Sequence, residues 1–397
     1  MRTLRCKAIS CLRMKRNGST SDVIFLLGAG ASVPLGMPTT RTLREKLCDD
    51  TPDGRLAAEI HRSAAYRFRI SEGDTNIELF LEHLYELQSM LWLASRSSLP
   101  ALLPKFTGHA GISSSAEARL KSLNERAFQL LHETCGDCNG KAAERLWRPI
   151  LHAVKGRQPV IPVFTLNYDW TFEKLAIESS ARYQLTDGFD LLGGTWDQRR
   201  FMKIARHPDK TNIALFKLHG STNWLPGGPI KSMGSFDPDP ETDSSGYPPQ
   251  GFEMVYPAHA HERRFGDEYR DHINDPTGSV YPWAEKEPYR TLHRYLHNFT
   301  QRAKVIVIIG YAFGDKLVNA ELAAAVNKRA ETRVVVVDPG INRYVKRTDS
   351  SHWDAPFESL KFGPDDYRWS AFEWIRGNFG DKKVADKLVK TINCGPE

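Results

Sequence analysis

Two polar motifs in this sequence combine side chains that could orient a ligand and move a proton. The motif TLNYD (165–169) places an amide two residues before a carboxylate, and KLHGS (217–221) places a histidine beside a glycine that leaves space for a ligand. Imidazole is a common general base near pH 7, although a lone histidine is more often structural. A buried amide needs hydrogen-bond partners. We therefore predict that Asn167 and His219 are functional residues.

Two glycine-rich turns could hold the phosphates of a nucleotide. GAGAS (28–32) and GYAFGD (310–315) each follow an apolar run. Glycines let the backbone turn tightly and approach a pyrophosphate, whose charge the N-terminus of a following helix favours. Val33 stands where the dinucleotide fingerprint has its third glycine, so the first turn is equally compatible with an ordinary strand-to-helix connection.

The acidic residues of these segments allow two interpretations. Asp169 could bind a ligand, or it could form an Asx turn and cap a helix that begins near Trp170. Asp338 ends the last apolar run. It could accept hydrogen bonds from a ribose diol, or it could cap a helix.

Each motif lies at the end of a short apolar run. Such runs, rich in Val, Ile and Leu, are typical of parallel strands that are buried on both faces. Open α/β sheets bind ligands outside the carboxyl ends of their strands, so we expect one nucleotide-sized site built from several segments. The sequence thus predicts an α/β fold, with a Rossmann-like parallel sheet and flanking helices. The five runs with their motifs are 23–32, 160–169, 214–224, 304–315 and 333–340.

Further segments are expected around this sheet. A long stretch of apolar residues at helical spacing predicts a helical insertion, too long for an ordinary crossover helix. A proline-rich stretch predicts a loop-rich excursion that serves as a lid or partner surface, or is only a surface loop. The expected parts are a disordered basic leader (1–22), the α/β domain (23–47, 156–224 and 300–345), the helical insertion (48–155), the excursion (225–299) and a C-terminal helical cap (346–397).

Composition narrows the class of protein. The chain has 397 residues, a formal net charge of +6 and six cysteines, and its mean hydropathy is -0.45. No apolar run approaches the ~20 residues that span a bilayer, and the N-terminus lacks the apolar stretch of a secretory signal. We expect a cytoplasmic protein with no membrane partner and reduced thiols. The mild charge requires no direct nucleic-acid partner.

The motifs together resemble the sirtuin-like NAD-binding family. GAGAS, TLNYD, LHGS and GYAFGD, followed by the strand-end Asp338, occur in the order seen there, and the pattern TxNYD with GYxFGD is similar to the prokaryotic branch associated with anti-phage defence. Sirtuin deacetylases carry a four-cysteine zinc module after the His-Gly motif, whereas this chain has no cysteine between His219 and Gly310. Cys135 and Cys138 cannot fill a tetrahedral zinc site alone, even with His132 as a third ligand, so no zinc is expected.

The resemblance implies an NAD glycohydrolase, with NAD as the substrate and nicotinamide and ADP-ribose as products. Asn167 would orient the nicotinamide ribose or the attacking water, His219 would act as a general base, and Asp169 would bind the carboxamide. The other expected NAD-binding residues are Gly28, Ala29, Gly30 and Ser32 at the pyrophosphate, Gly310, Phe313 and Asp338 at the adenosine half, and Pro38 and Thr39 in a segment where the family has an arginine-bearing stretch.

Regulation and two rival functions complete the expectations. Because unregulated NAD hydrolysis would poison the cell, we expect gating by homo-oligomerisation or by a partner. The resemblance suggests a defence effector beside a HerA-type DNA-translocating ATPase. The first rival is an NAD-dependent protein deacylase or ADP-ribosyltransferase. The second is a non-enzymatic NAD or ADP-ribose sensor.

Overall fold

The computed structural model describes most of the predicted α/β domain and much of the helical insertion. The predicted basic leader, apart from Asp22, and most of the loop-rich excursion lie outside the described residues, although residues 288–299 at the end of the excursion are described. Within the described part, no helix is long and apolar enough to cross a membrane. The described residues are 22–68, 114–136, 138–189, 196–202, 209–222, 230–231, 288–329, 331–340 and 370–393, with scattered positions between 72 and 88.

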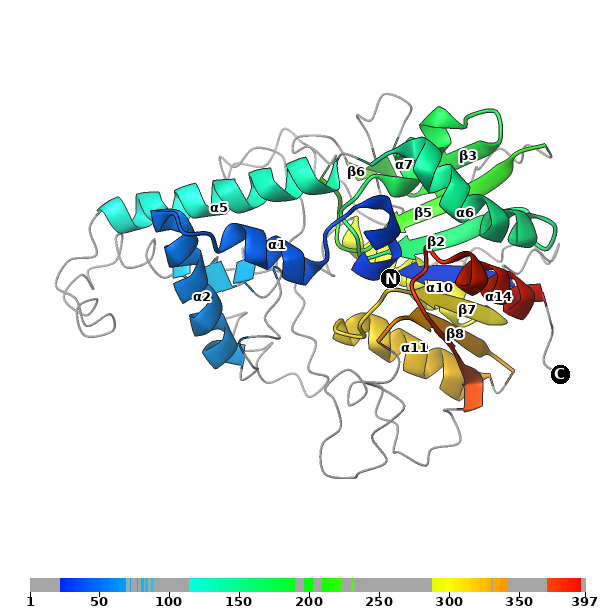
Figure 1. Ribbon diagram of the computed structural model, residues 1–397. Helices are drawn as coiled ribbons and strands as arrows, with labels where there is room; N and C mark the ends of the chain where they lie inside the picture. Colours follow the sequence, from blue (N-terminus) through cyan, green and yellow to red (C-terminus); the bar gives the residue numbers. More distant parts are fainter. Residues whose placement is uncertain are drawn as a thin grey trace, which may run out of the picture.

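A seven-stranded parallel sheet forms the centre of the molecule (Figure 1). Its order is β3-β5-β2-β1-β7-β8-β9, and every neighbouring pair is parallel. All five predicted apolar runs form strands of this sheet, which confirms the predicted Rossmann-like class. Those strands are β1 (Val23–Leu27), β2 (Ile161–Thr165), β5 (Thr211–Lys217), β7 (Val305–Ile309) and β8 (Arg333–Asp338).

Two strands of the sheet were not expected. They are β3 (Tyr183–Thr186) and β9 (Phe372–Arg376), which occupy its two edges. The expected helical cap at 346–397 is therefore incomplete, since β9 precedes helix α14 (Lys382–Asn393) there. The sequence FEWIR is short and aromatic, which suits a half-buried edge strand. A separate pair, β4 (Trp196–Asp197) and β6 (Ile230–Lys231), lies outside the sheet.

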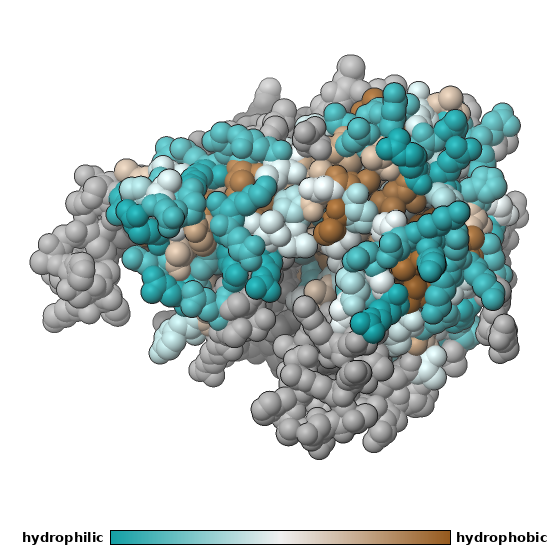
Figure 2. Space-filling view, viewed as in Figure 1, coloured by the Kyte–Doolittle hydropathy of each residue, from teal (hydrophilic) through white to brown (hydrophobic). Residues whose placement is uncertain are grey.

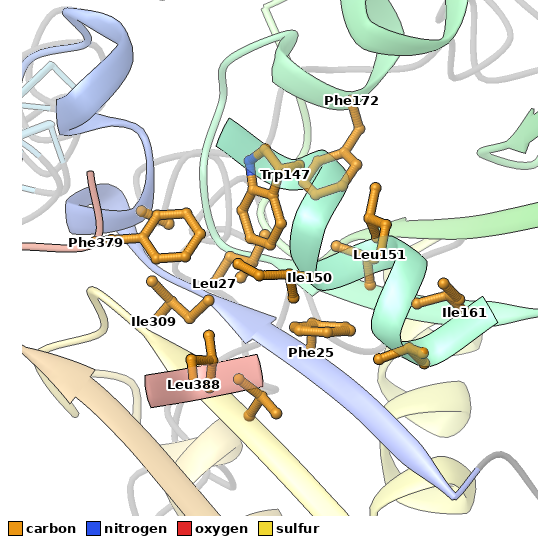
Figure 3. Packing of buried hydrophobic residues seen from close by; sticks show 14 of the residues in the cluster. Phe25, Leu27, Trp147, Ile150, Leu151, Ile161, Phe172, Ile309, Phe379 and Leu388 are labelled. Atoms are coloured by element: carbon orange, nitrogen blue, oxygen red, sulfur yellow. The ribbon is translucent and has the colours of Figure 1, made fainter. Parts of the chain in front are cut away.

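Helices cover both faces of the sheet, because alternate strand residues point to opposite sides. One face packs against α6 (Gly140–Lys155), α7 (Thr171–Glu178) and α14. Trp147 of α6 lies at the centre of this layer, between Phe172 and Phe379 (Figure 3). The opposite face packs against α10 (Tyr289–Thr300) and α11 (Lys316–Lys328). The result is a three-layer α/β/α sandwich.

A helical lobe extends from one side of this sandwich (Figure 1). It comprises α1 (Thr40–Leu47), α2 (Pro52–Phe68), α5 (Ser114–Cys135) and the described positions between 72 and 88. The lobe has its own apolar core, which also includes Tyr168 of the TLNYD motif. Helix α1, which was expected to belong to the α/β domain, contributes Leu43 and Leu47 to this core. In Figure 2 the described surface of the lobe is mostly hydrophilic.

The carboxyl ends of the central strands lie side by side. In the parallel registers, Leu27 is opposite both Thr165 and Ile309, and Thr165 is opposite Lys217. The chain runs from β1 to β2 and on to the edge strand β3, returns to β5 between β3 and β2, and then crosses to β7 on the other side of β1. The strand order therefore reverses between β1 and β7. In open α/β sheets such a switch point is the place where ligands bind.

Candidate functional site

The two glycine-rich turns interlock at the switch point. The backbone amides of Gly28 and Gly30 donate to the carbonyls of Ile309 and Gly310, both at 3.0 Å. A Cβ on Gly30 would lie 2.7 Å from the Gly310 Cα, and one on Gly310 would lie 2.3 Å from the Ala31 nitrogen. Gly310 also has a φ of 61°, in the left-handed region. Close contact between the two turns thus explains these glycines without a phosphate.

A network of buried side chains joins the first turn to the TLNYD motif. Asn167 donates through Nδ2 to the Gly28 carbonyl at 3.0 Å and to Ser32 Oγ at 3.1 Å. Ser32 Oγ in turn donates to Asp169 Oδ2 at 2.6 Å. Asp169 Oδ1 accepts from the Thr171 amide at 3.0 Å, so the expected Asx turn is present as well. Three of the predicted site residues, Ser32, Asn167 and Asp169, therefore form one rigid group.

His219 forms a second buried pair, with a residue that was not among the predicted site residues. Its Nε2 lies 2.7 Å from Asp315 Oδ2. Burial by itself would raise the pKa of Asp315, but the hydrogen bond with His219 lowers it, as do the charges of His219 and His293 in their protonated forms, and the net pKa lies below its ordinary value. The Asp315 carboxyl is therefore ionised at neutral pH. Asp315 belongs to the GYAFGD motif, and an acid after two glycines was a sequence signal for a functional side chain, although not for its partner.

The LHGS segment is tied to the backbone of the TLNYD segment. Ser221 Oγ and Thr222 Oγ1 both donate to the Tyr168 carbonyl, at 3.2 and 3.1 Å. The Thr222 amide donates to the same carbonyl at 3.2 Å. The structure thus brings the segments of both predicted catalytic residues, Asn167 and His219, into direct contact.

Lys217 lies beneath these segments and is almost completely buried. Its Nζ donates to the Asp169 carbonyl at 2.5 Å and to Ser221 Oγ at 2.6 Å, and it lies 2.8 Å from Glu173 Oε1 of α7. Burial raises the pKa of Glu173, against the opposing effect of the Lys217 charge. Sequence reasoning assigned no role to either residue. A lysine at the end of an otherwise apolar strand was the signal available.

A small cavity adjoins this network on the α6 and α7 side of the sheet. Its volume is about 10 Å³, roughly the space for one water molecule. Both polar and apolar side chains surround it, so a water there would have partners. The lining includes Ser32, Trp147, Asn167, Asp169, Glu173 and Lys217.

Phe313, Asp338 and Thr39, three more of the predicted NAD-binding residues, make local contacts within their own segments. Phe313 is 1% exposed and packs against Tyr311, so its ring is already covered by the protein itself. Asp338 Oδ1 accepts from the Gly340 amide at 2.5 Å, and Thr39 Oγ1 caps α1 by accepting from the Thr42 amide at 3.2 Å. Ala29 begins a 3-10 turn (Ala29–Ala31), and Pro38 precedes the capping threonine in a half-buried segment.

The described cysteines are not arranged as metal ligands. Cys48, Cys135 and Cys138 are free thiols, and no group of three metal-binding side chains occurs in the described ranges. Burial raises the pKa of Cys135 to about 11, and it raises the pKa of Cys138 as well. Both thiols are therefore protonated at neutral pH and poor nucleophiles. The side chain of His132 lies outside the described residues.

The strand order and the polar edge at the switch point define a Rossmann-like α/β protein. A family model described as a SIR2-like domain matches residues 162–355, so this part of the chain is similar to SIR2-like domains. The match begins in β2 and includes TLNYD, LHGS and GYAFGD. No curated protein matches the sequence significantly.

Two solved structures are also similar to this chain. A Sir2 homologue mutant in complex with ADP-ribose is 13% identical, with a TM-score of 0.35, and the match covers 93% of this chain and 91% of that one. A Sir2 homologue in complex with NAD is 13% identical, with a TM-score of 0.34 and coverage of 93% and 88%. Scores this low add nothing to the conclusions drawn from the sheet and the family model.

Proposed function

We propose that this protein is an NAD glycohydrolase that cleaves NAD to nicotinamide and ADP-ribose. The observation that carries the proposal is the buried network of Ser32, Asn167 and Asp169 at the switch point of a SIR2-like domain. The LHGS segment with His219 is tied to the same loop. This arrangement supplies fixed acceptors and a base at the edge where an α/β sheet binds a nucleotide.

The hydrogen bonds already made by these residues fit the expected parts of NAD. Both Nδ2 hydrogens of Asn167 are used by Gly28 and Ser32, so Oδ1 is the side-chain atom left to accept from a ribose hydroxyl or a water. Each oxygen of Asp169 accepts one hydrogen bond from the protein and has capacity for another. That carboxylate could therefore accept from the amide NH₂ of nicotinamide.

The chemistry requires orientation and electrostatics more than a strong nucleophile. Nicotinamide leaves NAD as a neutral base, and the ribose carbon acquires oxocarbenium character while water attacks. Asn167 would hold the water or ribose hydroxyl, and His219 would accept the proton that is released. Fixed dipoles and charges of this kind lower such barriers by several kcal/mol.

The helical lobe gives this proposed activity a route for control. Tyr168, between Asn167 and Asp169 in sequence, is buried in the core of the lobe. A partner or second copy that moved the lobe would therefore act directly on the TLNYD loop. We propose gating of this kind in a cytoplasmic anti-phage effector that acts as a homo-oligomer or with a HerA-type ATPase.

The test is incubation of the purified protein with NAD, with the products resolved by chromatography. Asn167→Ala and His219→Ala should each lower turnover by about 10²- to 10⁴-fold, the usual value of a positioned acid–base group. His297→Ala is the matched control, because His297 is an exposed histidine on α10 that pairs with Glu321; it should retain full activity.

The same samples separate the alternatives. Protein-linked ADP-ribose as the main product would replace the glycohydrolase with a transferase, and acetyl-ADP-ribose formed after an acetylated peptide is added as acyl donor would replace it with a deacylase. Thermal stabilisation by NAD without products would indicate a sensor, or an enzyme without its trigger. The absence of both stabilisation and products would contradict the proposed site. Full activity of the monomer alone would contradict the gating.

A further inference from the structure

The contact between His219 and Asp315 joins two strand ends that are far apart in the sheet. His219 follows β5 and Asp315 follows β7, and strands β2 and β1 lie between them. Three strand spacings of about 4.8 Å separate the two strand ends by about 14 Å. The segments after both strands must therefore reach over the carboxyl ends of β2 and β1, where Asn167 and Gly28 follow, to bring Nε2 within 2.7 Å of Oδ2.

The GYAFGD turn is held in place by its own buried side chains. The Tyr311 hydroxyl donates to the Asp315 carbonyl and accepts from the Asp315 amide, both at 3.0 Å, and it lies 2.9 Å from Asn319 Oδ1. Asn319 Nδ2 donates to the Phe313 carbonyl at 2.6 Å. Phe313 has a φ of 57°, a conformation that costs energy for a non-glycine residue. These contacts fix the backbone at Asp315.

The two carboxylate oxygens of Asp315 have separate partners. Oδ1 accepts from the amides of Leu317 and Val318, at 2.8 and 3.0 Å, and so caps α11. Oδ2 faces His219. A helix cap alone would use only the first oxygen, and an asparagine or serine would serve equally well. The second oxygen therefore has a role besides capping.

His293 of α10 is a further titratable group near this pair. Burial, together with the His219 charge and against the opposing effect of Asp315, lowers the pKa of His293 to about 4. His293 is therefore neutral at pH 7 and does not neutralise the Asp315 carboxylate. Asp315 is left as the charged acceptor for the His219 ring.

We propose that Asp315 is a positioning residue, which holds neutral His219 as the Nε2–H tautomer and leaves Nδ1 as its basic nitrogen. An ionised carboxylate only accepts hydrogen bonds, so the ring nitrogen that faces it must carry the proton. When Nδ1 takes a proton, the same carboxylate stabilises the imidazolium. The catalytic consequence rests on the proposed NAD hydrolysis, whereas the tautomer is a property of the protein itself.

Asp315→Asn separates the two roles of the carboxylate. Asparagine is as good a helix cap as aspartate, but its NH₂ group would face His219 and favour the opposite tautomer, with the proton on Nδ1. Asp315→Ser keeps a capping oxygen and removes the contact with the ring. Tyr311→Phe is the matched structural control, since it weakens the turn and leaves the carboxylate in place.

The tautomer can be measured directly by ¹⁵N NMR of labelled histidines, with the His219 signal identified by its loss in His219→Gln. We expect the Nε2–H form in the wild type and in Tyr311→Phe, and the Nδ1–H form in Asp315→Asn. An Nδ1–H form in the wild type, or an unchanged tautomer in Asp315→Asn, would overturn the proposal. This measurement is decisive even if the protein never hydrolyses NAD.

Kinetics then test the catalytic consequence. Asp315→Asn should lower kcat for NAD by about 10²- to 10⁴-fold, with KM changed by no more than about threefold. Asp315→Ser should lose less, because the ring is freed but not held in the wrong tautomer. If Tyr311→Phe lowered kcat as much as Asp315→Asn while its tautomer stayed unchanged, the loss would come from the disturbed turn and not from the tautomer. The catalytic consequence would then be wrong. A wild type that turns over no NAD would refute the proposed function but not the tautomer assignment.

Discussion

The sheet domain and the helical lobe each bury a histidine, and the two are treated differently. His219 is 5% exposed and lies 2.7 Å from a carboxylate. His61 on α2 is 2% exposed and stacks on Phe80 with ring centroids 4.3 Å apart. Neither ring nitrogen of His61 has a hydrogen-bond partner among the described residues. One histidine is placed in a charged network, whereas the other is packed as if it were an aromatic core residue.

The rest of the buried polar side chains follow the same division. The lobe buries only His61 and His83 in the part of it that is described, and His83 pairs with Ser63. The carboxyl edge of the sheet buries a dense set of partnered charges and amides. Such groups are costly to bury and are retained where they orient chemistry. The comparison therefore favours the sheet domain over the lobe as the location of the proposed site, and it favours a packing role for the buried histidines of the lobe.

The largest effect should come from breaking the charge pair beneath the site. Lys217→Met leaves Glu173 buried without its cation, which typically costs about 3 to 5 kcal/mol of unfolding free energy. Urea denaturation would measure the loss. Lys174→Met, one residue after Glu173 on α7, is the control, because the Lys174 ammonium lies over the Trp170 ring at 5.6 Å and is half-exposed.

The double variant Lys217→Met with Glu173→Gln should recover part of that stability, because it removes the unpaired charge. A Lys217→Met protein as stable as wild type would mean that the charged network is not integral to the sheet domain. The proposed difference between the charged network of the sheet domain and the apolar packing of the lobe would then be wrong.

The second effect concerns the interlocked turns. Gly310→Ala forces a Cβ to within 2.3 Å of backbone atoms at a φ of 61°. Backbone strain of about 1 to 2 kcal/mol and overpacking of about 1 to 3 kcal/mol should together destabilise the protein by a few kcal/mol. Gly314→Ala in the same motif meets nothing within 4 Å, so its melting temperature should match the wild type. Equal effects of the two substitutions would contradict the steric account.

The third effect concerns how the buried His61 of the lobe changes the stability of the protein at acidic pH. Burial, assisted by the nearby charge of Arg44, lowers the pKa of His61 to about 3. As the pH falls, His61 is therefore protonated in the unfolded chain before it is protonated in the folded protein. The free energy of unfolding should fall as the pH drops from about 6.5 towards 3, by about 1.4 kcal/mol per pH unit. His61→Leu should reduce this acid sensitivity. His152→Gln, at an exposed position on α6, controls for the loss of a histidine as such.

The sequence predicted the central strands and their carboxyl ends better than the edge strands and the surrounding segments. Near-continuous apolar runs are a strong signal, so the five central strands and the convergence of their motifs were predictable. Strand β9 was missed because FEWIR is short and half-buried, and its pairing with β8 is set by tertiary contacts. Contacts such as His219 with Asp315 join residues 96 positions apart. Spacing in one sequence contains no information about such pairs, even though both motifs were recognised.

The smallest effect on stability should come from the exposed surface of the lobe. Tyr66 on α2 is 89% exposed, and Ile177 on α7 of the sheet domain is 71% exposed. Tyr66→Ser and Ile177→Ser should each change unfolding free energy by less than about 0.5 kcal/mol. Aromatic side chains are enriched at protein interfaces, so the proposed homo-oligomer predicts weaker self-association for Tyr66→Ser alone. Analytical ultracentrifugation would measure self-association of both variants. If Ile177→Ser weakened self-association as much as Tyr66→Ser, the contact between copies would not be specific to the lobe.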